Sequence, residues 1–402
     1  MRFSLLLTWL LLASTAGTAL AQTAAEAVQM ADDGRDAEAL AAFRQIAARN
    51  PNDLEARLWI ARLHERMGNP DQAESVYRSV LLEDPASLDA ALGVASTLLA
   101  RDEIDETIEL LEAIEERAPQ NATLLALLGR AHRRAGRDAR AIGYFERAAA
   151  IAPTDEHRLG LENARLSYGH RIETRGFNEQ FSGGTPDSTG GDLTVNVRLS
   201  ERLRVLGRGH AQRKFSVSEQ RGGGGVEWRW RPSTTLRTHL LLGPGNLVMP
   251  EGDFLGELDY TYGPAVWTAT VRYFDFTGAR TTFLSPGVAW PATDRISIAL
   301  RYAMSFTETS ASKGVEVGHS AQLRGSYRFL RRLFLQVGYA AGVEEFENFS
   351  IDRIGDFRAN TVTGGVRLDL PTLTSIAAGY EQQWRRGNVD MGRVVVTLQQ
   401  RF

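Results

Sequence analysis

Nine arginines in the C-terminal half of this 402-residue chain stand at positions that alternate with apolar side chains. A guanidinium group binds both oxygens of a carboxylate or phosphate, and rings of arginine favour anions in pores. These arginines are Arg198, Arg204, Arg208, Arg229, Arg237, Arg301, Arg324, Arg328 and Arg367. Fewer acids share their face, namely Glu227, Glu257, Asp259, Asp369 and Glu381. Pairing with these acids is the alternative role, whereas a surplus of arginine predicts an anionic polysaccharide or a phosphate-bearing glycan as cargo.

A second group of arginines recurs at helical spacing in the N-terminal half. Its members are Arg62, Arg66, Arg130, Arg133 and Arg134. Guanidinium groups gathered in a groove could hold the carboxylates of a protein partner. The alternative is a solvated helix face on which neighbouring acids such as Glu65 cancel the charge.

Other chemistry finds little support in the sequence. The chain has no cysteine, which excludes disulfides, thiolate metal sites and cysteine nucleophiles. Its seven histidines do not follow metal-ligand spacings, and the glycine run 222–225 enters an alternating segment and not a helix. We therefore predict a protein that is not an enzyme and needs no metal or cofactor. An enzyme acting on lipid or glycan remains the alternative, because lipid hydrolases use serine and histidine.

The composition divides the chain near residue 165. Residues 1–165 contain 18 basic and 26 acidic residues, and residues 166–402 contain 28 and 23, which together give the overall charge of −3. Alanine and leucine dominate the first part, and glycine, aromatic residues, threonine and valine dominate the second. Two domains are therefore expected, at residues 22–165 and 166–402.

Prolines in the first part recur every 34 residues, at Pro51, Pro85, Pro119 and Pro153. A 34-residue period is typical of tetratricopeptide repeats, in which each repeat is a pair of antiparallel helices. We expect about four repeats in residues 22–165, followed by a closing helix near residues 156–166. Such arrays commonly bind other proteins in a concave groove.

Other columns keep the same register. Gly34, Gly68 and Gly136 fall at the expected turn, where glycine accepts a positive φ. The small column is Ala39, Ala73, Thr107 and Ala141, and the large column is Phe43, Tyr77, Leu111 and Phe145. The third repeat departs from the pattern at its turn, where Asp102 replaces glycine.

Hydrophobic residues in the second part alternate with polar ones. Residues 295–306 alternate over twelve positions, longer than the usual soluble strand. Such strands suit a transmembrane barrel with an apolar outer face and a wet interior. A charge on the lipid face costs about 2–4 kcal/mol near mid-membrane, so the nine arginines should face inward. We predict an antiparallel barrel of about fourteen strands, with twelve as the fallback and a soluble β-sandwich as the alternative.

The two ends of the chain carry signals of their own. Arg2, an apolar run and the small-residue pattern Ala19-Leu20-Ala21 predict a signal peptide at residues 1–21, with a short membrane anchor as the alternative. The last residue, Phe402, follows an alternating strand and looks like the signal read by the barrel assembly machinery. Together these features predict a Gram-negative outer-membrane protein with its repeats in the periplasm.

This arrangement resembles YaiO-type outer-membrane β-barrel proteins that carry tetratricopeptide repeats. The resemblance depends on the domain order and on Gly364-Gly365-Val366, Gly379-Tyr380 and Arg401-Phe402. On a larger scale the layout is similar to polysaccharide export porins. The resemblance implies a barrel that anchors the array or acts as a pore, in envelope or exopolysaccharide export. A purely structural anchor is a further alternative.

Overall fold

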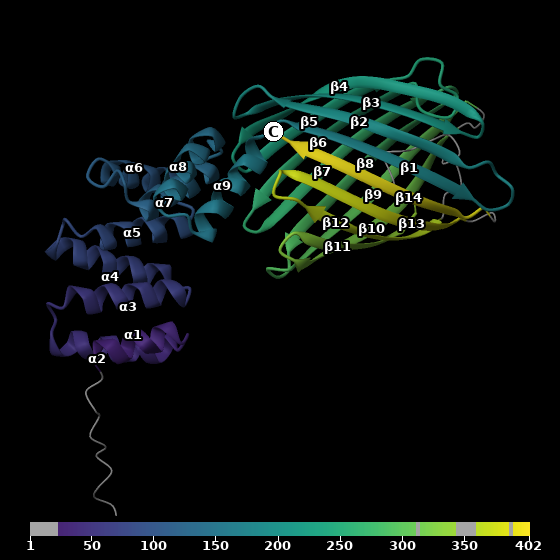
Figure 1. The fold of residues 1–402 in the computed structure, drawn as a ribbon. Helices are drawn as coiled ribbons and strands as arrows, with labels where there is room; N and C mark the ends of the chain where they lie inside the picture. The colour runs from purple at the N-terminus through teal and green to yellow at the C-terminus, as the bar shows by residue number, and fades with distance from the viewer. Residues whose placement is uncertain (1–22, 311–313, 343–358, 386–388) are drawn as a thin grey trace, which may run out of the picture. The chain divides into compact units, whose positions relative to one another are not determined.

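The computed structural model describes residues 23–310, 314–342, 359–385 and 389–402. The predicted signal peptide at residues 1–21 lies outside them. The chain forms two compact units, the first made of Met1–Ala135 and Gly143–Gly160 and the second of Gly136–Ile142 and Leu161–Phe402. Figure 1 shows helices in the N-terminal part of the chain and strands in the C-terminal part.

In the described part of the chain, nine helices precede the strands. They are α1 (Ala24–Asp32), α2 (Asp36–Arg49), α3 (Leu54–Arg66), α4 (Pro70–Glu83), α5 (Leu88–Ala100), α6 (Ile104–Glu115), α7 (Ala122–Arg134), α8 (Asp138–Ile151) and α9 (Asp155–Tyr168). From α1 to α7 each helix packs against the next one. The closing helix, α9, continues past the predicted boundary at residue 165.

The 34-residue period places a capping residue at the start of the first helix in successive pairs. Asp53, Ser87 and Asn121 cap α3, α5 and α7, because their side-chain oxygens accept hydrogen bonds from the amides of Ala56, Ala90 and Leu124 at 2.9, 3.4 and 2.9 Å. Such a cap satisfies an amide that has no partner within the helix.

The turns within the helix pairs have the predicted left-handed backbone. The φ angles of Gly34, Gly68 and Gly136 are 78°, 76° and 74°. Asp102 occupies the same place in the third repeat with a φ of 64°. Aspartate tolerates this conformation better than most residues, so the helix pair forms without the glycine.

Aromatic side chains of the second helices fill the space against neighbouring helices. Phe43 stacks on Trp59 with ring centroids 5.4 Å apart. Tyr77 packs so closely on α5 that a Cβ atom at Gly93 would lie 2.4 Å from its ring. The small and large columns therefore form the core of the first unit.

A buried histidine makes the stability of the first unit depend on pH. Arg44 Nη2 lies 3.1 Å from His64 Nε2, and burial, followed by the charge of Arg44, lowers the pKa of His64 below 6.5. An unfolded chain therefore binds this proton more readily than the folded one, so the repeats should lose stability as the pH falls below about 6.5. Thermal unfolding of the full-length protein, followed by circular dichroism at 222 nm, should give a lower Tm at pH 5.5 than at pH 7.5. His64→Gln should reduce that difference, and an equal difference in the variant would contradict the role of His64.

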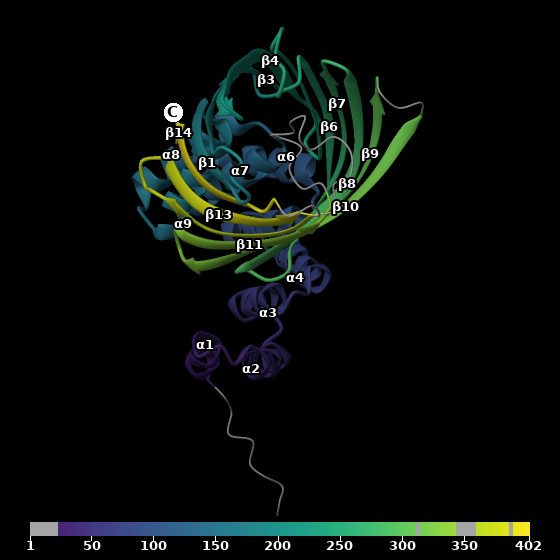
Figure 2. The ribbon, with the colours of Figure 1, turned by 90° about the vertical axis from the view of Figure 1, so that its right-hand side faces the viewer.

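The second unit is a closed antiparallel barrel, and within the described residues its strands number fourteen. They are β1 (Arg171–Phe181), β2 (Ser188–Arg198), β3 (Leu203–Lys214), β4 (Val217–Arg231), β5 (Thr234–Leu242), β6 (Gly252–Tyr262), β7 (Ala265–Phe276), β8 (Ala279–Pro291), β9 (Ile296–Thr309), β10 (Val315–Leu330), β11 (Leu333–Ala341), β12 (Ala359–Asp369), β13 (Thr374–Arg385) and β14 (Met391–Arg401). Each strand pairs with its neighbours in sequence, and β14 pairs with β1 to close the ring. Figure 2 shows the strands curving around an interior. The predicted helical array and fourteen-strand barrel are thus confirmed.

The outer face of the barrel is apolar and exposed. On β9, for example, Ile296, Leu300 and Tyr302 are 40%, 44% and 42% exposed. An exposed apolar wall of this kind fits a lipid environment. Among the described residues, no helix has both the length and the apolar character needed to cross a bilayer.

The glycine run on β4 brings two strands together. A Cβ atom added to Gly223 would lie 2.0 Å from the carbonyl oxygen of Leu240, and one added to Gly225 would lie 2.0 Å from that of Thr238. Both obstacles are backbone atoms of β5, which cannot move aside as a side chain could. The run is therefore part of the barrel wall. This agrees with the sequence, in which the run enters an alternating segment and not the helix that a phosphate-binding loop requires.

The last residue closes the ring beside the start of β1. The amide of His170 donates to the carbonyl oxygen of Phe402 at 2.8 Å, and the amide of Phe402 donates back at 3.1 Å. The Phe402 ring lies 5.5 Å from the ring of His170 and remains 63% exposed.

Candidate binding chamber inside the barrel

The interior of the barrel has two different halves. We call the end where the chain enters at Arg171 and leaves at Arg401 the terminal end, and the opposite end the loop end. Inward side chains near the loop end are buried, as Phe274, Thr361 and Met391 show with 0% exposure each. Many inward side chains near the terminal end, among them Ser297 and Gln336, remain exposed. We call the loop-end half, whose inward side chains are the more buried, the packed half, and we call the other half the hollow half.

Ion pairs hold the packed half together. Asp253 is fully buried and accepts from Arg221 at 2.9 Å and from Arg272 at 2.7 and 2.8 Å. Arg393 and Glu179, which are 214 residues apart in sequence, form another buried pair across the β1–β14 seam at 3.0 Å. These charges can be buried because each contacts a charge of opposite sign.

One carboxylate holds a loop against the packed half. Glu219, at an inward position of β4, accepts from the backbone amides of Leu247, Val248 and Met249 at 2.5, 2.8 and 2.7 Å. Val248 and Met249 are buried, with 7% and 2% exposure. Part of the connection between β5 and β6 therefore fills the loop end.

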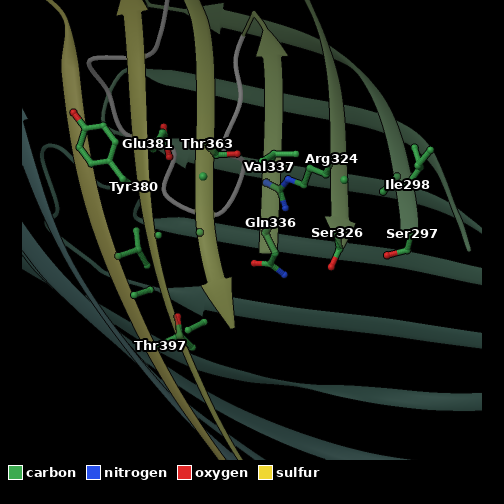
Figure 3. A pocket seen from close by; sticks show the side chains of 18 of the residues that line it. Ser297, Ile298, Arg324, Ser326, Gln336, Val337, Thr363, Tyr380, Glu381 and Thr397 are labelled. Atoms are coloured by element: carbon green, nitrogen blue, oxygen red, sulfur yellow. The ribbon is translucent and has the colours of Figure 1, made fainter. Parts of the chain in front are cut away.

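The hollow half contains two adjoining cavities of about 570 and 390 Å³. Arg175, Ala289, Ala299 and Arg324 line both of them, so we treat the two as one chamber. Figure 3 shows the smaller cavity, where Ser326 and Gln336 stand near Arg324. Its walls on β8 to β14 carry mostly small or hydroxylated side chains, which leaves room for a ligand.

The larger cavity is positively charged. Seven arginines and three acids line it. Asp192 accepts from both Arg175 and Arg208, at 2.9 and 3.0 Å. Glu257 lies 2.5 Å from Arg237 and 3.5 Å from Arg301. Two guanidinium groups share each of these carboxylates, and arginines outnumber acids in the lining of the cavity.

Most of the nine arginines singled out in the sequence have a carboxylate partner. Arg204 lies 3.8 Å from Glu227, Arg367 lies 3.2 Å from Asp369, and Arg237 also contacts Glu227 and Asp259. Within the second unit, Arg198 and Arg229 lie 3.1 and 3.5 Å from Asp138. Structural pairing thus accounts for much of the arginine content.

Two of the nine have no carboxylate partner among the described residues. Arg328 donates to the backbone carbonyl of Asp294. When the side-chain amide of Gln322 is turned so that its oxygen faces Arg324, that oxygen accepts two hydrogen bonds from the guanidinium at 2.9 and 3.1 Å. Because this amide is neutral, it does not compensate the charge of Arg324. Sequence reasoning missed Arg171 and Arg175, which also line the larger cavity. The alternation test, if extended to residues 171–181, could have found them.

The groove arginines are mostly engaged within the first unit. Arg62 lies 2.7 Å from Asp89, Arg66 lies 2.7 Å from Asp36, and Arg134 lies 3.6 Å from Asp102. These pairs and a further one between Arg130 and Glu156 are consistent with the solvated-face alternative.

Arg133 differs from the other four groove arginines. It is exposed and has no ion-pair partner in the described parts of the chain. Burial and the nearby charges of Arg133 and Arg134 lower the pKa of Arg130. Arg133 is therefore the groove arginine best placed to contact a partner.

The histidines in the barrel lie apart from one another. Inside it, His210 Nδ1 lies 2.8 Å from Asp192 within a cluster of arginines. On the outer face, His319 Nδ1 lies 2.7 Å from the hydroxyl of Tyr302. The described residues contain no group of three or more acids or histidines that could hold a metal ion.

Comparison with known proteins concerns the helical half. Residues 30–97 and 92–156 each match a tetratricopeptide repeat family model. Tetratricopeptide repeat protein 21B of Xenopus laevis is 29% identical over 126 residues, which are 31% of this chain. The chain spans about 10% of the length of that relative.

Two solved structures are similar to the same region. TTC0263, a thermophilic TPR protein in Thermus thermophilus, is 24% identical, with a TM-score of 0.34 over 35% of this chain and 78% of that one. MamA from Desulfovibrio magneticus RS-1 is 22% identical, with a TM-score of 0.31 over 35% and 80%.

Proposed function

We propose that this protein is a non-enzymatic outer-membrane anchor whose repeat array captures a protein partner in the periplasm. The observation that carries the proposal is the closed barrel with an exposed apolar outer face, following tetratricopeptide repeats in one chain. In this proposal residues 1–21 direct export, and the assembly machinery recognises the strand that ends at Phe402. The arrangement would make the protein similar to the YaiO-type barrels.

The process that we propose is envelope or exopolysaccharide export. Support comes from the arginine-rich chamber, because positive charge suits an anionic polysaccharide. The packed loop end favours an anchor or a gated passage over a permanently open pore, since buried side chains occupy that half.

Location and topology are tested together by fractionation and proteolysis. The protein should fractionate with the outer membrane, and the detergent-solubilised form should change its electrophoretic mobility on heating. Trypsin added to intact cells should leave the repeats whole, whereas trypsin added after permeabilisation of the outer membrane should remove them. A soluble protein with heat-insensitive mobility would overturn the proposal, and cleavage of the repeats in intact cells would contradict their periplasmic position.

Partner capture should depend on Arg133. Arg133→Glu should reduce recovery of an acidic periplasmic partner up to about fivefold, because an exposed ion pair contributes at most about 1 kcal/mol. Binding should also weaken with added salt. Arg117→Glu is the matched control, since Arg117 is exposed outside the proposed groove. Equal recovery with both variants and no salt dependence would favour a solvated helix face.

A further inference from the structure

The chamber in the hollow half of the barrel combines two kinds of wall. One side, on β1 to β6, presents Arg171, Arg208 and Arg237. The other side, on β9 to β14, presents Ser297, Ser326, Gln336 and Thr397, together with small residues. One wall suits an anionic group, and the other suits a body rich in hydroxyl groups.

In the described part of the chain, buried polar atoms of the larger cavity lack a hydrogen-bond partner. They are the guanidinium donors Arg171 Nε and Arg208 Nε and the ring nitrogen His239 Nε2, and all three residues line that cavity. Buried donors are normally satisfied. Their gathering around one cavity therefore indicates the place of an anion with several acceptor oxygens.

Two of the cations in the chamber are not needed to neutralise acids. Neither Arg171 nor Arg324 pairs with a carboxylate among the described residues, and Arg324 donates hydrogen bonds to the uncharged amide of Gln322. Phosphate and carboxylate groups accept two parallel hydrogen bonds from a guanidinium. These two arginines are therefore the best-placed ligands for an incoming anion.

We propose that the chamber binds a sugar bearing a phosphate or carboxylate group, which enters through the terminal end. The charged group lies among Arg171, Arg208 and Arg324, and the hydroxyl groups of the sugar face Ser297, Ser326 and Gln336. The packed half stops the ligand short of the loop end. This site rests on the proposed function because it takes a glycan as the cargo. It does not depend on what the repeat array binds.

The test is isothermal titration calorimetry on the full-length protein in neutral detergent at low ionic strength. Glucose 6-phosphate and glucuronate should bind, glucose should not, and inorganic phosphate should bind more weakly than the phosphorylated sugar. Equal binding of glucose, or no binding of either charged sugar, would overturn the proposal. Phosphate binding as tight as that of glucose 6-phosphate would overturn the assignment of a sugar body.

Variants locate the site. Arg171→Gln combined with Arg324→Gln should weaken glucose 6-phosphate binding at least tenfold, and unchanged binding would overturn the assignment. These substitutions leave no acid unpaired, so the barrel should still fold and change its mobility on heating. Arg213→Gln, on the exposed face of β3, is the matched control and should bind like the wild type.

A second variant tests the space and not the charge. Ala299→Leu narrows both cavities and should abolish binding, while Leu at an outward position, Ala321→Leu, should not. Binding that survives Ala299→Leu would place the ligand elsewhere. Absence of sugar binding by the wild-type protein, with correct fractionation, would refute this site alone, whereas failure of outer-membrane fractionation would refute the proposed location without affecting the calorimetry.

Discussion

Asp253→Asn should lower the free energy of unfolding of the barrel by about 3–5 kcal/mol, the usual effect of removing one partner from a buried ion pair. Asp253 has no exposed surface and neutralises two buried arginines, Arg221 and Arg272. The neutral amide removes the carboxylate that both of these positive charges contact in the packed half. Urea unfolding in detergent, followed by the change in electrophoretic mobility, measures the loss.

Asp275→Asn is the matched control for this prediction. Asp275 pairs at 3.3 Å with Arg280, and both side chains are well exposed, at 44% and 64%. An exposed pair of this kind contributes no more than about 1 kcal/mol. Similar losses in the two variants would show that burial of Asp253 does not determine its contribution.

The double variant Gly223→Ala with Gly225→Ala should fail to assemble into a heat-modifiable barrel. Each new methyl group would meet a backbone oxygen of β5, at Leu240 or Thr238, 2.0 Å away. Overpacking costs about 1–3 kcal/mol per site, and here only a shift of the strand can relieve it. The expected result is loss of β4–β5 pairing and little folded protein in the outer membrane.

The neighbouring strand supplies the control. Gly207 and Gly209 on β3 have the same spacing, and a Cβ atom at either position meets nothing within 4 Å. Gly207→Ala with Gly209→Ala should assemble normally, because the added methyl groups meet no neighbouring atom. Alanine also restricts the conformations of the unfolded chain more than glycine does, which favours the folded state. Normal assembly of the β4 variant would mean that the wall can separate there without harm.

Local periodicity explains what the sequence could predict. A helix pair that repeats every 34 residues has its turn at the same position in each repeat. The glycines at that position, Gly34, Gly68 and Gly136, therefore predicted turns with a left-handed backbone. A strand sends successive side chains to opposite faces, so alternation over residues 295–306 revealed one exposed apolar face. Strand number followed because each alternating segment gives one strand.

The interior could not be predicted in the same way. Alternation tells which face a side chain is on, but it does not tell which strand lies across the barrel. The pair formed by Glu179 and Arg393 and the loop bound by Glu219 depend on contacts between distant segments. For that reason the alternation predicted a wet interior, but it did not predict that one half would be packed and the other hollow.

The pairing of β1 with β14 has a consequence for the order in which the protein folds. Each helix of the repeats contacts mainly the helices next to it in sequence. The repeats can therefore fold before the C-terminal strands have assembled. Ring closure joins Arg171 to Arg401, and contacts between such distant residues form slowly. Until then β1 and β14 are both unpaired edges, which readily join other strands. A chain that stops before Met391 lacks β14 and therefore cannot close the ring. It keeps two strand edges with unpaired backbone groups, and we expect it to aggregate or be degraded.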